Sequence, residues 1–278
     1  MNKISKIFIS LLLIPLNIWA QLPLPFGHSH NDYLQKRPLF QAIELGFGSI
    51  EIDVCLDKYH NIRVAHDPIF LSTKKTIEEM YFDPIVKMIN DGDTMFKYTN
   101  DNPLVLMIDI KTNADSTYIY LKKIFLKYAD YIKQYKNNDL VHDAPLYISI
   151  SGAKPWQLMQ KDTLLFAHMD GSLELTNVDS FLLANRERSE LMDRASLPYT
   201  QYKKYKRQFN STEELLLNMQ VINGIYGARG IRTRFWAVPN NEKVWNELLL
   251  AGVTWINVDR LNKFSEFYKK WLSNLPTR

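Results

Sequence analysis

Two carboxylates stand two residues apart in the apolar stretch SIEIDVCL, residues 49–56. Side chains alternate across a β-strand, so Glu51 and Asp53 share one face, about 6.5–7 Å apart. A stretch this apolar is typical of a strand that is covered on both faces, where water is scarce. Burying an unpaired charge costs several kcal/mol, so the pair needs a cation, either a basic side chain or a metal ion.

A second apolar stretch, LVLMIDIKTN, repeats the arrangement with Asp109 and Lys111 on one face. Asp109 could complete a three-carboxylate site with Glu51 and Asp53, an all-oxygen set that suits Mg²⁺ or Ca²⁺ rather than Zn²⁺. The alternative is a buried network of Lys111 and the carboxylates that holds no ion. The pattern alone leaves both interpretations open.

Histidines follow two other predicted strands. His66, in IRVAHDP, stands where a strand gives way to a turn, and His28 and His30 lie in FGHSHNDY. In a barrel of parallel strands, catalytic groups collect at the carboxyl ends, so these histidines are candidates for a general acid and a general base beside a metal site. Asp32, two residues after His30, either orients that ring or caps the helix that follows.

The elements that position these residues alternate between short β-rich runs and amphipathic stretches, which favours a (β/α)₈ TIM barrel. A helix is expected after Asn210, where Ser211 and Glu214 form a capping box, and another over residues 119–132 from its apolar spacing. The expected strands are Leu24–His28, Ser49–Leu56, Ile62–His66, Leu104–Ile110, Leu146–Ile150, Leu164–His168, Arg234–Val238 and Thr254–Val258.

Length and composition fit one domain over residues 21–278, since 46% of the 278 residues are hydrophobic and there is no internal repeat. Residues 1–20 have the basic start, apolar centre and small final residue of a signal peptide, which predicts export to the periplasm or the medium. The single cysteine, Cys55, excludes an intrachain disulfide.

The formal charge of +4 is too small to favour nucleic acid as a partner. The basic cluster at residues 203–207 is expected to be a solvated helix face, with peripheral contact to an anionic lipid surface as the less favoured interpretation. The protein is expected to be a monomer.

The phrases HSHNDY, ELGFGSIEIDV, IRVAHDP, LMIDIKT, RFWAVPN and GVTWINVDRL, taken together, resemble the superfamily of glycerophosphodiester phosphodiesterases and phospholipase-C-like phosphodiesterases. The first two phrases are most similar to the branch that includes the altered-inheritance-of-mitochondria protein 6 family. The resemblance spans nearly all of residues 21–278 and implies a metal-dependent phosphoric diester hydrolase acting on a glycerophosphodiester or a phospholipid headgroup.

The resemblance also implies roles for individual residues. Glu51, Asp53 and Asp109 would bind one divalent cation. His66 would be one catalytic histidine and His30 the other, with His28 as the competing choice. The residues implied to contact substrate are Asn31, Lys111, which would hold a phosphate oxygen or neutralise the carboxylates, and Trp236, which would wall the pocket.

The segment LQKRPLFQ departs from the superfamily, because it lacks the glutamate that bacterial glycerophosphodiesterases carry there, and Asp109 stands where many have Glu. Both features are closer to the venom-type sphingomyelinase D relatives. Two alternatives stay open. One is a zinc amidohydrolase-type barrel using the His-x-His of HSH with His168 and Asp259. The other is a barrel that binds a phospholipid or glycan without turnover.

Overall fold

Residues 24–274 are described by a computed structural model in which parallel strands close into a barrel. β1 and β2 pair with each other as well as with their other neighbours, which completes the ring. The predicted TIM barrel is therefore confirmed. The eight barrel strands are β1 (Leu24–Ser29), β2 (Phe47–Leu56), β4 (Leu104–Ile110), β7 (Leu146–Gly152), β8 (Ala167–Ser172), β9 (Met192–Pro198), β10 (Arg232–Trp236) and β11 (Trp255–Val258).

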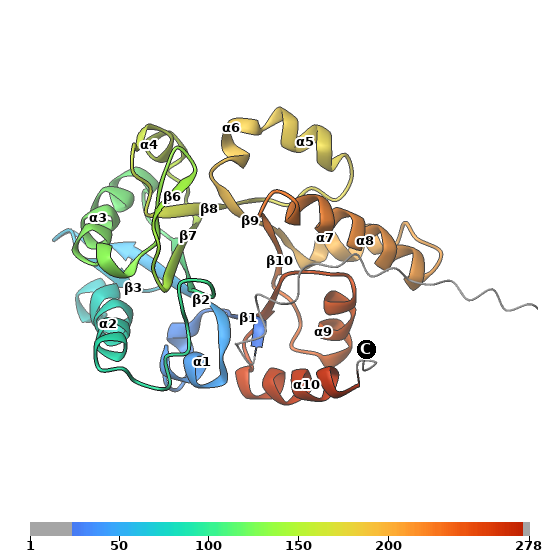
Figure 1. The fold of residues 1–278 in the computed structure, drawn as a ribbon, viewed down its shortest axis with the longest axis horizontal. Helices are drawn as coiled ribbons and strands as arrows, with labels where there is room; N and C mark the ends of the chain where they lie inside the picture. Colours follow the sequence, from blue (N-terminus) through green and yellow to red (C-terminus); the bar gives the residue numbers. More distant parts are fainter. Residues whose placement is uncertain (1–23, 275–278) are drawn as a thin grey trace, which may run out of the picture.

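Helices surround the strands, as Figure 1 shows in a view that looks along the barrel. They are α1 (Phe40–Leu45), α2 (Asp83–Asn90), α3 (Ala114–Lys127), α4 (Trp156–Lys161), α5 (Val178–Ala184), α6 (Arg186–Ser189), α7 (Tyr199–Lys206), α8 (Thr212–Gly227), α9 (Glu242–Leu250) and α10 (Leu261–Ser273). Short turns of helix occupy η1 (Asp32–Leu34), η2 (Leu71–Thr73), η3 (Glu78–Phe82) and η4 (Ala129–Tyr131). Within residues 24–274, no helix is both long enough and apolar enough to cross a bilayer.

One face of β2 packs in the hydrophobic core, and the other face carries the acidic residues of the site. Ile50, Ile52 and Val54 are fully buried in the hydrophobic core. Glu51 and Asp53 take the opposite face, as strand alternation predicts, and the register aligns Asp53 with Asp109 on β4. The strand pairing thus carries both acidic stretches to the same place in the barrel.

Two local predictions are confirmed. α8 begins after Ser211, whose hydroxyl accepts a hydrogen bond from the Glu214 N–H at 3.1 Å. α3 contains most of the apolar spacing expected over residues 119–132, although it ends at Lys127.

One predicted barrel strand was wrong and another was missed. β3 (Ile62–Val64) is antiparallel to β2 and lies outside the ring of parallel strands. β9 fills the place in the barrel instead. Its sequence, MDRASLP, carries the buried charged residues Asp193 and Arg194, so it lacks the apolar run by which a covered strand is recognised. A two-stranded hairpin, β5 (Gln134–Lys136) and β6 (Asp139–His142), is an addition to the barrel.

Candidate functional site

Three carboxylates meet in the barrel at the carboxyl ends of two adjacent strands. Glu51 and Asp53 on β2 and Asp109 on β4 each offer an oxygen, and these oxygens all lie within 4.8 Å of one another. Glu51 and Asp53 are buried, and Asp109 is nearly so. The predicted set of ligands is therefore brought together, and it has the oxygen chemistry that Mg²⁺ and Ca²⁺ prefer.

Positive charge near the two aspartates comes from one lysine. Lys111 Nζ lies 3.1 Å from Asp109 Oδ1 and 3.4 Å from Asp53 Oδ1, yet neither buried oxygen has a hydrogen-bond partner. Tyr33 donates a hydrogen bond to Asp53 Oδ2 at 2.9 Å. Burial raises the pKa of Asp53 to about 6 and also raises the pKa of Asp109, against the opposing attraction of Lys111. The lysine therefore compensates the aspartates incompletely, and the residues fit an added cation.

Glu51 has a different environment, because Arg234 on β10 neutralises it. Arg234 Nη2 lies 2.6 Å from Glu51 Oε2, and both side chains are buried. Arg234 also donates to Asn257 Oδ1 at 2.8 and 3.1 Å. Burial by itself would raise the pKa of Glu51, but Arg234 and the hydrogen bond from His28 outweigh it and hold the pKa well below its usual range. Glu51 therefore remains ionised.

The two histidines of HSH have different surroundings. His28 is fully buried, with Nε2 2.9 Å from Glu51 Oε2 and Nδ1 2.8 Å from Ser49 Oγ. Burial and the positive charge of Arg234 lower the pKa of His28, so its ring is neutral. Both ring nitrogens are thus occupied by protein groups, and the geometry favours His30 as the histidine that meets a substrate.

His30 is held by an acid that the sequence grouped with it only as a zinc ligand in the amidohydrolase alternative. His30 Nδ1 lies 2.6 Å from Asp259 Oδ1, 229 residues along the chain. Asn240 fixes Asp259 by donating to its Oδ2 at 2.5 Å and accepting from its backbone N–H at 3.0 Å. Burial alone would lower the pKa of His30, but the hydrogen bond with Asp259 and the charge of Glu51 outweigh it and raise the pKa. With Nδ1 bound, Nε2 is the nitrogen left for proton transfer.

Asp32 neither orients His30 nor contacts it. Its carboxylate instead accepts hydrogen bonds from Ser29, from Tyr81 and from the backbone N–H of Leu39, which precedes α1.

The other predicted residues lie around the carboxylates with more exposure. His66 is 61% exposed at its side chain and stands next to Ala65, whose N–H donates to the Asp53 carbonyl at 3.0 Å. Trp236 ends β10 and is 45% exposed. Asn31 is partly buried and adopts a left-handed backbone, with φ 47°, as the chain turns into η1. The roles predicted for these three side chains stay predictions.

Gly152 is a further residue of the site that the sequence did not reveal. Its φ is +69°, and a Cβ there would lie 2.1 Å from Asp109 Oδ1. Glycine is thus needed both for the left-handed backbone and for the room that Asp109 occupies. The sequence pattern that could have indicated this residue is a glycine directly after the run YISIS, at the end of a predicted strand.

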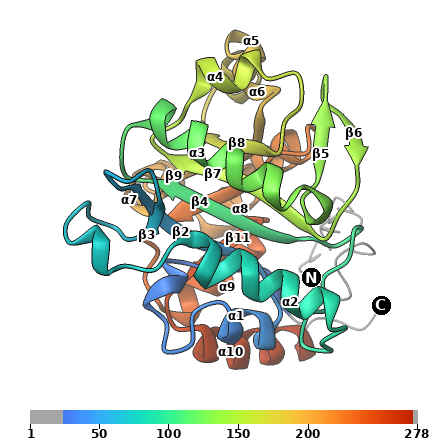
Figure 2. The same ribbon diagram turned by 90° about the vertical axis from the view of Figure 1, so that its left-hand side faces the viewer.

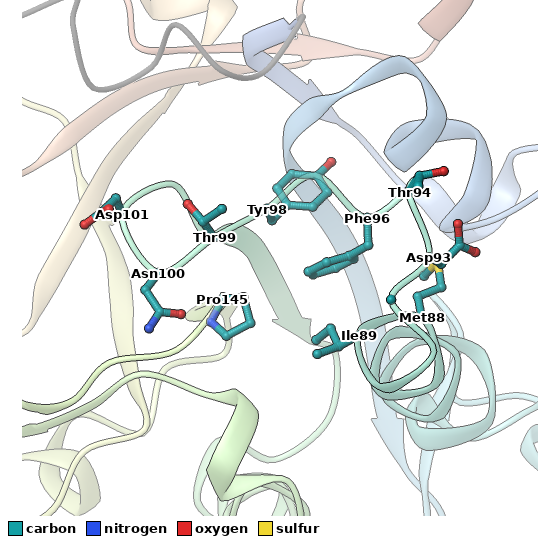
Figure 3. A pocket seen from close by; sticks show the side chains of 11 residues that line it. Met88, Ile89, Asp93, Thr94, Phe96, Tyr98, Thr99, Asn100, Asp101 and Pro145 are labelled. Carbon is teal, nitrogen blue, oxygen red and sulfur yellow. The ribbon is translucent and has the colours of Figure 1, made fainter.

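A cavity of about 700 Å³ lies elsewhere, at the amino ends of the strands (Figure 3). Its wall includes Asp101, just before β4, and Pro145, just before β7. None of the predicted site residues lines it. The remaining lining residues are Met88, Ile89, Gly92, Asp93, Thr94, Phe96, Tyr98, Thr99 and Asn100.

The closed parallel barrel with its surrounding helices matches the fold of solved glycerophosphodiester phosphodiesterases. A glycerophosphodiester phosphodiesterase from Thermotoga maritima superposes with a TM-score of 0.50 at 15% identity, covering 87% of this chain and 97% of that one. One from Parabacteroides distasonis has a TM-score of 0.49 at 13% identity, covering 88% and 97%.

Sequence comparison identifies the family. Residues 20–166, just over half of the 278 residues, match the family described as AIM6-like phosphodiesterase domain, and the chain belongs to it. Altered inheritance of mitochondria protein 6 from Eremothecium gossypii is 27% identical, with 86% of this chain and 68% of the relative covered. A homolog from Arthroderma benhamiae is 23% identical, with 89% and 84% covered. The predicted resemblance is confirmed.

Proposed function

We propose that the protein is a divalent-cation-dependent phosphodiesterase that cleaves a glycerophosphodiester or a phospholipid headgroup. The observation that carries the proposal is the meeting of Glu51, Asp53 and Asp109, with two buried aspartate oxygens left without hydrogen bonds. Lys111 is the one ammonium beside both aspartates, so the two carboxylates carry more negative charge than it balances, and an added cation would compensate the rest. The family and the fold support the phosphodiester class of substrate.

Asp53 and Asp109 would hold the cation together with Glu51, whose other partner is Arg234. A bound Mg²⁺ or Ca²⁺ supplies positive charge that polarises a phosphate oxygen. Lys111, already beside both aspartates, places its ammonium where the phosphate's negative charge increases. Trp236 and Asn31 would form part of the wall that contacts the substrate.

His30 would act as the general base. Asp259 binds Nδ1 and so fixes the ring orientation, which leaves Nε2 to take a proton from water or from a hydroxyl of the substrate. His66, one residue after the backbone that contacts Asp53, would protonate the leaving alkoxide. If a substrate hydroxyl attacks, a cyclic phosphate forms first, and water opens it in a second step.

The amidohydrolase alternative is disfavoured by the placement of its ligands. His28 uses both ring nitrogens on Ser49 and Glu51, and Asp259 holds His30. A zinc ion bound by both histidines of the HSH motif would have to displace Ser49 or Glu51 from His28. The other alternative, a barrel that binds a phospholipid or glycan without turnover, is distinguished from a phosphodiesterase by the NMR experiment described next.

The test is ³¹P NMR of the purified protein with a panel of glycerophosphodiesters, lysophospholipids and phosphatidylinositol, in Mg²⁺, in Ca²⁺ and in EDTA. We expect new phosphomonoester or cyclic phosphate signals that EDTA abolishes. Asp53→Asn and His30→Ala should abolish them, whereas Asp139→Asn, an exposed acid on β6, should not. Saturable binding with an unchanged spectrum in every metal would instead identify a binding protein.

We also propose that the protein is exported and monomeric, with residues 21–278 as one domain. The basic and apolar pattern of residues 1–20 supports export, and these residues lie outside the part that the structure describes. N-terminal sequencing of protein recovered outside the cytoplasm should begin at Gln21. Intact protein with Met1 in the cytoplasm would contradict the proposal of export.

A further inference from the structure

The segment between β3 and η3 carries two adjacent, exposed apolar side chains. In this β3 loop, residues 65–75, Ile69 is 60% exposed and Phe70 is 79% exposed. Single exposed apolar residues are ordinary on soluble proteins, but a continuous apolar projection marks a surface that meets another phase or partner. In Figure 2 this loop projects from the body of the barrel, at the left of the view.

Hydrogen bonds hold the loop in this conformation. The Val64 N–H donates to the Lys75 carbonyl at 3.0 Å, and Arg63 Nη1 donates to the Lys74 carbonyl at 2.8 Å, so the last residues of the loop are bonded back to β3, from which the loop begins. Near the tip, the Thr73 hydroxyl donates to the Phe70 carbonyl at 2.8 Å. Phe70 has φ 53°, a left-handed conformation that is unfavourable for a bulky residue. A strained backbone that presents a phenylalanine to solvent indicates a functional constraint.

The loop lies at the end of the barrel where the carboxylates meet. It begins at Ala65, whose N–H contacts the backbone of Asp53, and it includes His66. A second exposed apolar residue at this end is Leu34, 71% exposed, which follows directly after the tyrosine that hydrogen-bonds Asp53. A surface that engages the β3 loop would therefore be held against the opening of the site.

Basic side chains flank the apolar tip. Residues 57–75 include four lysines and arginines against two aspartates. Arg63 and Asp57 pair with each other at 2.8 Å, which leaves Lys58, Lys74 and Lys75, all exposed, against Asp67 and against Glu79, which accepts hydrogen bonds from Thr76 directly after Lys75. Three lysines against these two carboxylates leave the rim with a net positive charge. An apolar tip within a cationic rim is complementary to an anionic bilayer, whose lipid phosphates attract lysine and whose interior accepts apolar side chains.

We propose that the β3 loop docks the protein on an anionic lipid surface, with Ile69 and Phe70 entering the interface and Lys58, Lys74 and Lys75 contacting lipid headgroups. Docking would bring the opening of the site to the membrane, and, if the proposed phosphodiesterase function holds, lipid headgroups would be its substrates. The basic cluster at residues 203–207 is a poorer candidate, because the tyrosines of α7 are turned into the core and Lys206 is paired with Glu247.

Co-sedimentation with vesicles of phosphatidylcholine containing about a third phosphatidylserine tests the proposal, with pure phosphatidylcholine as the comparison. The assay is run in EDTA, so that binding is measured without turnover and a failure of the proposed catalysis leaves it unaffected. We expect binding to the anionic vesicles that weakens as salt is raised. Replacing Ile69 and Phe70 together by serine should weaken it by about tenfold or more.

Matched variants make the result specific. Leu183→Ser removes an equally exposed leucine, 75% exposed on α5, and should leave binding unchanged. Lys74→Gln with Lys75→Gln should weaken binding to anionic vesicles, whereas Lys203→Gln with Lys204→Gln should not. The proposal is overturned if the unaltered protein stays in solution, or if the serine pair binds as well as Leu183→Ser while all variants keep the same melting temperature.

Discussion

Replacing Arg234 by methionine should destabilise the protein strongly, because it leaves a buried charge without its cation. Arg234 lies 2.6 Å from Glu51, and both side chains are at most 5% exposed. His28 also contacts Glu51, but burial, the largest cause of its lowered pKa, persists in the variant and opposes protonation of the ring even after the charge of Arg234 is removed. Methionine fills most of the volume, so the change removes mainly charge and hydrogen bonds.

The magnitude follows from the burial. Removing one partner of a buried ion pair costs about 3–5 kcal/mol in the free energy of unfolding. For a chain of this size, each kcal/mol lowers the melting temperature by about 2–4 °C, so we expect a fall of about 6–20 °C. Changing Glu51→Gln in the same protein should recover part of this loss, because no unpaired carboxylate then remains.

Thermal and urea unfolding in EDTA measure this loss without a cation to neutralise Glu51. The matched control is Arg37→Met, which breaks an arginine–glutamate pair of equal length, 2.5–2.6 Å, that lies on the surface with 58% of the arginine side chain exposed. Its melting temperature should be nearly unchanged. Equal losses for Arg234→Met and Arg37→Met would refute the argument that burial determines the strength of this pair.

Three further predictions concern the pH dependence of stability, the room that Gly152 leaves beside Asp109, and the orientation of His30 by Asp259. Burial lowers the pKa of His168 from 6.5 to about 4, so the unfolded chain binds a proton more readily than the folded protein does. The free energy of unfolding should therefore fall by on the order of 3 kcal/mol between pH 6.5 and about pH 4. Urea unfolding of His168→Phe over the same pH range should lack this loss. Gly152→Ala should weaken Mg²⁺ or Ca²⁺ binding measured by calorimetry, whereas Gly230→Ala, with φ +71° and open space around it, should not. Asp259→Asn should lower turnover by about a hundredfold or more. It should also shift the acidic limb of the pH–rate profile to lower pH, because the carboxylate that raises the pKa of His30 is gone. An unchanged pH–rate profile would contradict the role of Asp259 in orienting His30.

The local pattern was sufficient for features that depend on neighbouring residues. Alternation along a strand fixed which side chains share a face, so Glu51, Asp53 and Asp109 could be grouped before their register was known. The cap of α8 is equally local: Ser211 accepts from the Glu214 N–H as expected, while the Glu214 carboxylate accepts from the N–H of Asn210. The barrel strand β9 was not predicted from the sequence, because its buried residues Asp193 and Arg194 make the segment polar.

By itself, the sequence determined the barrel, the acidic cluster and the presence of two histidines at the end of the first strand. Only the tertiary structure distinguished those histidines, since His28 points at Glu51 and Ser49 while His30 meets Asp259 from the other end of the chain. It also supplied Arg234 as the partner of Glu51, 183 residues away. The alternation of side chains along a strand predicts which face of the strand a residue occupies. The closure of the barrel decides which charged residue from a distant part of the chain lies opposite it, and that pairing sets the pKa of each group.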